Sequence, residues 1–141
     1  MAQRGRRLVL FDPNARPSLI RDPVDWRRRC GRWLAASDLV KMSDEDAQML
    51  APGRPLADVA VDCLRYGPQA VVITRGAEGA TLYRPGEAPL DVAPPPTRVV
   101  DTIGAGDTFA AGLTVALLEH GVESAEALAS LPTAQWLQVL R

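Results

Sequence analysis

The stretch that says most about the fold is Val99-Val100-Asp101-Thr102-Ile103-Gly104-Ala105-Gly106-Asp107-Thr108-Phe109-Ala110-Ala111-Gly112-Leu113. Its extended, apolar start leads into a glycine-containing loop, and an apolar-rich helix is predicted from about Thr108 to His120, with Gly121 as its stop. Because residues 104–106 have little or no side chain, their N–H groups can approach an anion, and the helix N-terminus adds partial positive charge. The segment predicts a strand-loop-helix unit that can hold a phosphate.

Asp107 stands beside the place where that phosphate would lie. A carboxylate there suits the general base for an attacking hydroxyl group in a phosphoryl transfer. Other phosphate-binding motifs fail on spacing: the chain has no GxxxxGK[ST] run, its only lysine is Lys41, and the glycines at 104, 106 and 112 do not form GxGxxG. On the loop residues alone, a simple strand-to-helix turn with Asp107 as N-cap fits equally well.

Upstream of this segment, apolar runs of strand length alternate with helical patterns. Leu8–Phe11 is apolar throughout, so we expect a strand buried on both faces. Trp26 and Trp33 recur at helical spacing and are expected to face the core. The upstream strands are predicted at Leu8–Phe11, Asp38–Met42 and Gln69–Thr74, and the upstream helices at Pro23–Ala36, Ser43–Leu50 and Pro55–Tyr66.

The remaining segments complete an α/β pattern. Short antiparallel strands are expected near Ala80–Arg84 and Leu90–Ala93, and Thr97 to Val100 resumes an extended segment after the prolines at 94–96. Ser124 to Arg141 predicts one or two helices, interrupted near Pro132. Buried strands that alternate with helices predict a three-layer α/β/α sandwich with a mostly parallel sheet.

Length and composition narrow the classes of function. A chain of 141 residues is the size of one domain, and 47% hydrophobic with 23% charged residues is ordinary for a globular protein. Residues 1–32 hold nine arginines against three acids, which we interpret as a solvated helix face; the net charge of -1 predicts no nucleic-acid partner. No apolar run approaches the ~20 residues of a membrane span, and residues 1–7 do not begin a signal peptide. Cys30 and Cys63 form no CxxC pattern, so a reducing cytoplasm is expected.

Residues 99–113 closely resemble the C-terminal signature of the PfkB/ribokinase family of carbohydrate kinases, in particular its fructokinase-like members. The resemblance implies a ribokinase-like fold, ATP as phosphoryl donor and Mg²⁺ as its metal. It implies that Asp107 takes the proton from the sugar hydroxyl and that the backbone of Gly104 to Asp107 forms the anion hole. Asp101 and Thr102 match positions that in many members help to hold a monovalent cation, so K⁺ is expected as well.

A second stretch, Val72 to Ala80, resembles the family's strand and turn along the nucleotide. The resemblance implies that Thr74, Gly76 and Gly79 are nucleotide-binding residues. The same TxGxxG spacing also describes a simple hairpin turn, which is the alternative.

A third stretch, Lys41 to Asp46, resembles a segment in which many members carry an Asn and a Glu three residues apart, associated with magnesium and phosphate. Those positions here are Ser43 and Asp46, so Asp46 is the candidate Mg²⁺ residue. A helix with a capping box, with Asp in place of the usual Glu or Gln, explains the pair equally well.

A fourth stretch, Phe11 to Pro17, resembles the strand end of fructokinase-like and ketodeoxygluconate-kinase-like members. Asp12, Asn14 and Arg16 are therefore expected near the sugar and phosphate, at the carboxyl end of a strand where α/β sites are built. The alternative is a turn in which Asp12 and Asn14 bond their own backbone.

The resemblance covers nearly all of residues 1–141 but only the C-terminal part of the family's domain. We therefore expect one partial kinase domain, with the N-terminal half and its lid over the sugar absent. A sheet without its first strands has an open edge and an uncovered apolar face. Poor stability, homo-oligomer formation or a complementing chain is the expected consequence.

The resemblance implies ATP-dependent phosphorylation of a sugar hydroxyl, with fructose first among acceptors and 2-keto-3-deoxygluconate or another small sugar next. A nucleoside or vitamin kinase of the same fold is disfavoured by residues 12–17. The alternative from another class is a catalytically inactive, nucleotide-binding or regulatory remnant of such a kinase.

Overall fold

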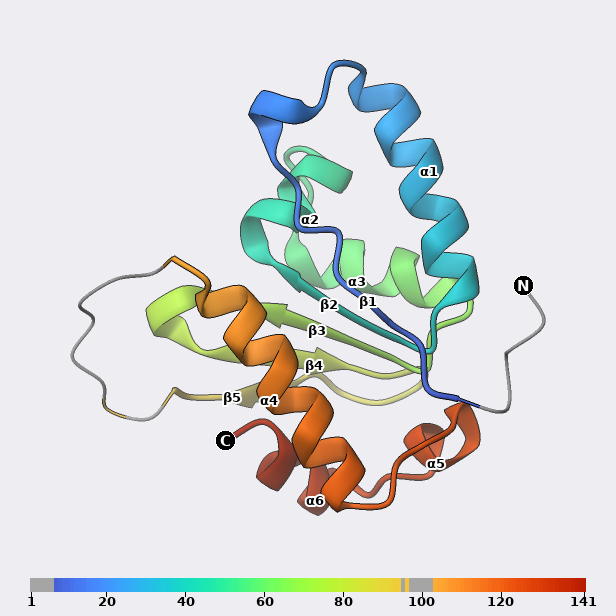
Figure 1. Cartoon of the computed structure of the whole chain (residues 1–141), viewed down its shortest axis with the longest axis vertical. Coiled ribbons are helices and arrows are strands. Elements are labelled where there is room, and N and C mark those ends of the chain that lie inside the picture. The colour runs from blue at the N-terminus through green and yellow to red at the C-terminus, as the bar shows by residue number, and fades with distance from the viewer. Residues whose placement is uncertain (1–6, 95, 97–102) are drawn as a thin grey trace.

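The computed structural model describes residues 7–94, 96 and 103–141, and a five-stranded sheet lies at its centre (Figure 1). Its strands, in spatial order, are β1 (Leu10–Phe11), β2 (Leu39–Ser43), β3 (Ala70–Thr74), β4 (Ala80–Tyr83) and β5 (Leu90–Val92). β1, β2 and β3 pair in parallel, whereas β4 pairs with β3 and β5 in antiparallel fashion. The predicted parallel majority therefore holds for strand direction, while the sheet's pairings are mixed.

One face of the sheet is covered by the first three helices. They are α1 (Pro23–Ala36), α2 (Asp44–Leu50) and α3 (Leu56–Arg65), and a 3-10 turn at Pro17–Leu19 precedes them. Since side chains alternate between the faces of a strand, Val40 and Met42 of β2 point to this layer. They pack there with Leu34 of α1, Ala47 of α2 and Val59 of α3.

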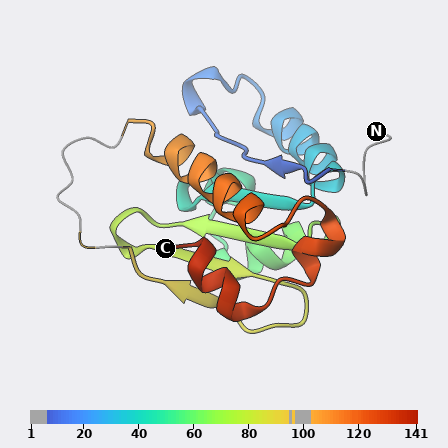
Figure 2. The same cartoon turned by 60° about the horizontal axis from the view of Figure 1, so that its bottom comes forward.

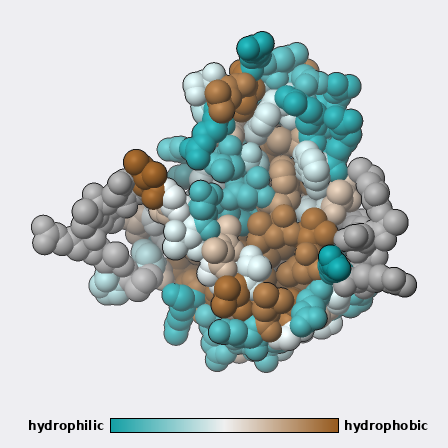
Figure 3. Space-filling model, in the orientation of Figure 1, coloured by the Kyte–Doolittle hydropathy of each residue, from teal (hydrophilic) through white to brown (hydrophobic). Residues whose placement is uncertain are grey.

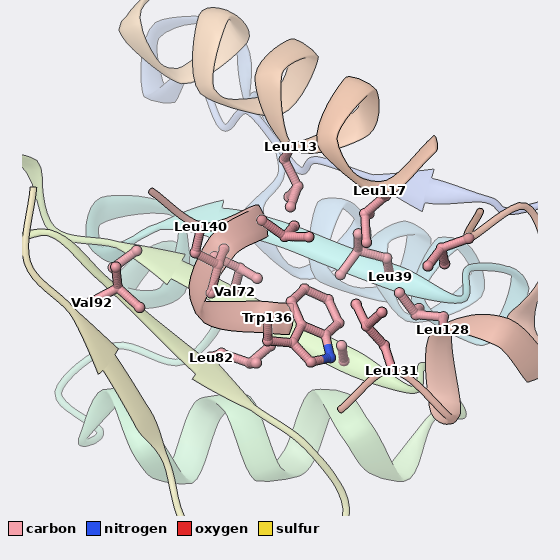
Figure 4. Close-up of a cluster of buried hydrophobic side chains, with 14 residues drawn as sticks. Leu39, Val72, Leu82, Val92, Leu113, Leu117, Leu128, Leu131, Trp136 and Leu140 are labelled. Carbon is pink, nitrogen blue, oxygen red and sulfur yellow. The ribbon is translucent and has the colours of Figure 1, made fainter. Parts of the chain in front are cut away.

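The opposite face is covered by the three C-terminal helices, as Figure 2 shows from below. They are α4 (Ala105–Glu119), α5 (Ala125–Ala129) and α6 (Thr133–Val139). The fully buried Trp136 of α6 fills the space between the sheet and α4, next to Leu82 and Leu131 in Figure 4. Leu113 and Leu117 anchor α4 to the same cluster. The expected three-layer α/β/α architecture is confirmed.

Helix boundaries follow the local chemistry of the sequence. Asp22 accepts bonds from the N–H groups of Val24 and Asp25 and caps α1, which ends at Ala36 as predicted. The predicted helix at 108–120 instead begins at Ala105, because Gly104 adopts a left-handed conformation (φ 75°) that turns the chain into the helix three residues earlier. The C-terminal region forms two helices separated at Pro132, in agreement with the prediction.

Two burial predictions were wrong. Leu10 and Phe11 of β1 are half-buried rather than buried on both faces, because β1 is the edge strand of the described sheet. Trp33 was expected in the core but is 62% exposed, and its ring stacks on Phe11 with centroids 6.3 Å apart. Both deviations lie at the same open edge. The extended segment expected at 97–100 falls outside the described residues.

Two adjacent leucines of α4 test this packing. Leu117 is fully buried, whereas Leu118 is 52% exposed. Leu117→Ala is expected to lower the free energy of unfolding by about 2–5 kcal/mol, because it leaves a cavity between α4 and the sheet. Leu118→Ala should lower it by less than about 1 kcal/mol. Urea unfolding followed by tryptophan fluorescence measures both, and equal losses would contradict the described orientation of α4.

Candidate functional site

The candidate site lies where the parallel strands end. Asp12 follows β1, Ser43 is the last residue of β2 and Thr74 is the last residue of β3, so these residues lie together at the carboxyl ends of the parallel strands. The N-terminus of α4 lies against the same edge. The carboxyl ends of strands are where α/β folds build their ligand sites, as the sequence predicted.

A polar cavity of about 380 Å³ opens at this edge. It brings together most of the residues predicted for catalysis and sugar binding and the one predicted for Mg²⁺, although they come from three separate segments. These are Asp12, Asn14, Arg16, Asp46, Gly104, Gly106 and Asp107. Asp101 and Thr102, predicted for a monovalent cation, lie outside the described residues.

A second, largely apolar cavity of about 260 Å³ adjoins the first. All three residues predicted along the nucleotide, Thr74, Gly76 and Gly79, line it together with Ala105 and Gly106. The first of these glycines begins a short 3-10 turn, Gly76–Glu78. Gly106 lines both cavities, so the start of α4 is their common wall.

The first turn of α4, which forms this wall, contains backbone N–H groups that can donate hydrogen bonds. The Thr108 N–H donates to the Gly104 carbonyl at 2.9 Å and closes the first helical turn, and no side chain caps the helix. The N–H groups of residues 105–107 therefore have no partner within the helix. Asp107 lies inside the first turn rather than at the N-cap, which Gly104 occupies. The alternative of Asp107 as a capping residue was wrong.

Lys41 is a site residue that sequence reasoning missed. Only 3% of its side chain is exposed, and its Nζ donates to Asp12 Oδ2 at 2.9 Å. Nζ also lies 3.0 Å from where a β-carbon on Gly106 would fall. A signal was present: a lysine within the otherwise apolar strand Leu39–Met42 needs a buried counter-charge, and Asp12 follows the neighbouring strand.

Asp12 combines the two interpretations that the sequence left open. Its Oδ1 accepts the Asn14 N–H at 3.0 Å, which is the local turn given as the alternative. Its Oδ2 accepts from Lys41, and the carboxylate also lines the polar cavity. Each oxygen of Asp12 thus already accepts one bond from the protein.

Asp46 is held entirely by backbone donors. Its Oδ1 accepts the Ala15 N–H at 2.7 Å and its Oδ2 accepts the Ser43 N–H at 3.0 Å, while the Ser43 hydroxyl accepts the Asp46 N–H. The capping box with Asp in the Glu position is confirmed. The bond to Ala15 also fixes the loop that carries Asn14 and Arg16 beside the cavity.

The two cysteine thiols are unsuited to catalysis. Burial raises the pKa of the Cys30 thiol and of the Cys63 thiol to about 11, so both are protonated at neutral pH. Within residues 7–94, 96 and 103–141, no three His, Cys, Asp or Glu side chains are grouped to hold a metal ion. No helix of that part of the chain is long and apolar enough to span a bilayer.

Residues 1–134 match the family model for pfkB family carbohydrate kinases. A fructokinase from Rhizobium leguminosarum bv. trifolii is 39% identical over 125 residues, which cover 89% of this chain and 38% of that protein. A 2-dehydro-3-deoxygluconokinase from Dickeya dadantii (strain 3937) is 35% identical over 116 residues, which cover 80% of this chain and 37% of that protein. The chain thus spans less than two fifths of the length of these curated relatives.

The fold has a counterpart among solved structures. A fructokinase double mutant from Vibrio cholerae O395, bound to fructose, ADP and potassium ion, superposes with a TM-score of 0.75 at 27% sequence identity. The superposition covers 94% of this chain and 40% of that chain. This similarity confirms the fold that residues 99–113 implied.

Asp46 gives a test that separates a structural role from a metal-binding one. Asp46→Ala removes two bonds from backbone donors to a carboxylate, so it should lower the free energy of unfolding by about 2–3 kcal/mol, equally with and without Mg²⁺. Asp44→Ala, in the same first turn, should lower it by less than about 1 kcal/mol. Stabilisation of the wild type by Mg²⁺ that Asp46→Ala lacks would instead support the predicted magnesium role.

Proposed function

The chain belongs to the pfkB family of carbohydrate kinases, and we propose that it carries the phosphoryl-transfer site of a fructokinase-like enzyme. The observation that carries the proposal is the shared wall of the two cavities. An ATP molecule in the apolar cavity and a sugar in the polar one would meet at Gly106 and Asp107. Residues 1–141 are, in this proposal, one part of a kinase domain.

The proposed reaction follows from the groups around that wall. A sugar hydroxyl gives its proton to the Asp107 carboxylate while its oxygen attacks the terminal phosphorus of ATP and the bond to ADP breaks. The N–H groups of residues 105–107, which have no partner within the helix, are proposed to stabilise the charge that develops on the transferred group. Gly104 permits this geometry, since its left-handed backbone brings the amides to the cavity.

The nucleotide is proposed to lie along Thr74, Gly76 and Gly79. The apolar lining of this cavity, which includes Phe109 and Leu140, suits the adenine ring. The proposed donor is ATP, in keeping with the ADP bound by the Vibrio cholerae fructokinase.

Magnesium fits the charge of the polar cavity. Its lining has four carboxylates, on Asp12, Glu45, Asp46 and Asp107, against two cationic side chains, on Arg16 and Lys41. A triphosphate would be repelled from such a lining unless it brought a divalent cation, which Mg²⁺ does while keeping most of its own water ligands. A magnesium contact from Asp46 and a potassium site at Asp101 and Thr102 stay predictions.

The proposed acceptor is fructose, and the 2-dehydro-3-deoxygluconate of the Dickeya relative, also called 2-keto-3-deoxygluconate, is the second candidate. Asn14 and Arg16 also line the polar cavity and are the proposed sugar contacts. Arg16 can pair with a carboxylate, which favours the sugar acid if Arg16 determines specificity. Two buried thiols suit the proposed cytoplasmic location.

One observation favours the second candidate, a nucleotide-binding protein without turnover. The whole loop from Gly104 to Asp107 is exposed to solvent in the described structure. Phosphoryl transfer to a sugar requires water to be excluded, because water competes as the acceptor. With the loop open to water, the expected result is a protein that binds the nucleotide without phosphorylating a sugar.

The chain is also proposed to associate, with a second copy or a complementing chain. Figure 3 shows apolar surface gathered over β1 and the C-terminal half of α4. The exposed apolar side chains include Trp33 beside the β1 edge and Val115 and Leu118 on α4. An open strand edge flanked by apolar surface is a site for pairing with another chain.

Solution size and stability test this association. Light scattering on the purified chain should give a mass above that of one 15.2 kDa chain, and Trp33→Lys should shift the distribution toward the monomer. The reason is that a charge beside the β1 edge opposes its burial. A monomeric sample with a single cooperative thermal transition would contradict the proposal.

Kinase activity is tested with ATP, Mg²⁺ and a panel of sugars that includes fructose and 2-keto-3-deoxygluconate. Asp107→Asn keeps the shape of the side chain but cannot take the proton, so kcat is expected to fall about 10²–10⁴-fold. Asp58→Asn is the matched control, because the Asp58 side chain is 57% exposed and lines neither cavity. Absence of turnover in a folded, ATP-binding wild type would favour the non-catalytic candidate.

A further inference from the structure

We propose that Lys41, held by Asp12, is the cation that contacts the transferring phosphoryl group. The inference rests on the proposed kinase function and assigns it a residue. Lys41 is the only lysine of the chain and lies on the central sheet, outside the glycine loop that makes up the sequence signature. Its place in the molecule is what connects it to that loop.

The position of the ammonium group comes from two independent contacts. Lys41 is the third residue of β2, and its Nζ lies at the polar cavity, 2.9 Å from Asp12 Oδ2. The same Nζ lies against the first turn of α4 at Gly106. The ammonium therefore stands between the sugar side of the cavity and the N–H groups proposed as the anion hole.

Gly106, on α4, is a second indication that the Lys41 ammonium lies against the first turn of this helix. Its backbone is helical and does not have the positive φ that explains the glycine at 104. A β-carbon there would lie 3.0 Å from Lys41 Nζ, closer than nearly all such contacts. The lysine is pinned by Asp12 and has little freedom to move away. A side chain at 106 would therefore require the ammonium to shift by a few tenths of an ångström, which shows how closely Lys41 approaches α4.

The place of Lys41 in the cavity lining and the number of its hydrogen-bond donors indicate the role of the ammonium group. A buried lysine whose only purpose was to neutralise Asp12 would need no access to the cavity, yet both residues line it. An ammonium has three donors, and one of them bonds Asp12. Asp12 is the one hydrogen-bond partner of Nζ among the described residues, so the other donors are available to a phosphoryl oxygen near the amides of α4. Lys41 exchanges no proton in this step, since Asp107 accepts the proton of the hydroxyl.

Asp12 is then a positioning residue. With Oδ1 fixed by the Asn14 N–H and Oδ2 by Lys41, it ties the sugar-side loop to the ammonium. If Lys41 and Asp12 formed only a structural ion pair, the effect of losing one charge would come from the unpaired partner. Neutralising both residues should then restore the property that the single substitution changed. A phosphoryl contact cannot be restored in that way.

The first test measures, by calorimetry, the affinities of Mg²⁺-ADP and of Mg²⁺-AMP-PNP, which adds a third phosphate. Lys41→Met is expected to weaken AMP-PNP binding about 10-fold or more, while ADP binding changes less than about 3-fold, because the lost contact is a charged hydrogen bond to the third phosphate. The double variant Asp12→Asn with Lys41→Met should show the same selective loss. Recovery of AMP-PNP affinity in the double variant, or equal losses for both nucleotides, would overturn the proposal.

The second test needs no variant and so does not depend on a substituted chain folding. With ¹⁵N-labelled lysine, the wild type has a single side-chain ammonium signal, because Lys41 is its only lysine. The signal should shift with AMP-PNP and move much less with ADP, and a signal that responds to neither nucleotide while both bind would sink the assignment. A wild type that binds neither nucleotide overturns the proposed function and this inference together, whereas binding without the lysine response overturns only the inference.

Discussion

The packing of α4 against the sheet is the interaction on which the functional end of the molecule depends. Leu113 and Leu117 bury one side of the helix against a cluster completed by Trp136, and this fixes where the helix lies over the sheet. Its first turn then stands over the end of β1, which Asp12 follows, and over Lys41 in the middle of β2. A shift of the helix along its axis by one residue, about 1.5 Å, would separate Gly106 from the lysine. The burial of apolar side chains in the core thus determines how the polar groups of the cavity lie relative to one another.

The site also shows how a fold can gather like charges without destabilising itself. Asp46 gives both carboxylate oxygens to backbone N–H groups, and Asp12 divides its oxygens between a backbone N–H and an ammonium. Buried carboxylates satisfied in this way act as structural braces for the loop at residues 12–16. Asp107 differs because it is exposed and lies in a helix turn that favours negative charge. Of these three acids, it is the one whose side chain is both exposed and part of the lining of the polar cavity.

Much of this arrangement could be predicted from local patterns. Runs such as Val71-Val72-Ile73 indicate buried strands, Asp22-Pro23 indicates a helix start, and residues 99–113 carried the family and the fold. Lys41 was missed because its position depends on Asp12, a partner 29 residues away that follows the neighbouring strand. Trp33 misled for a related reason: helical spacing tells which residues share a face, but not whether another element covers that face. The start of α4 was misplaced because a left-handed glycine begins a helix that composition alone assigns to Thr108.

Electrostatics explains why the amides of α4 do not suffice for the proposed chemistry. A helix N-terminus offers an effective charge of about +0.5, which is small beside the charge of a triphosphate. It faces a cavity whose carboxylates outnumber its cationic side chains. An ammonium within contact distance of the transferred group supplies a full charge at one point, and Asp12 directs it without occupying all of its donors. The divalent cation that accompanies the nucleotide then balances the charge of the other carboxylates in the cavity. The helix, the lysine and the metal ion thus each neutralise a different part of the negative charge.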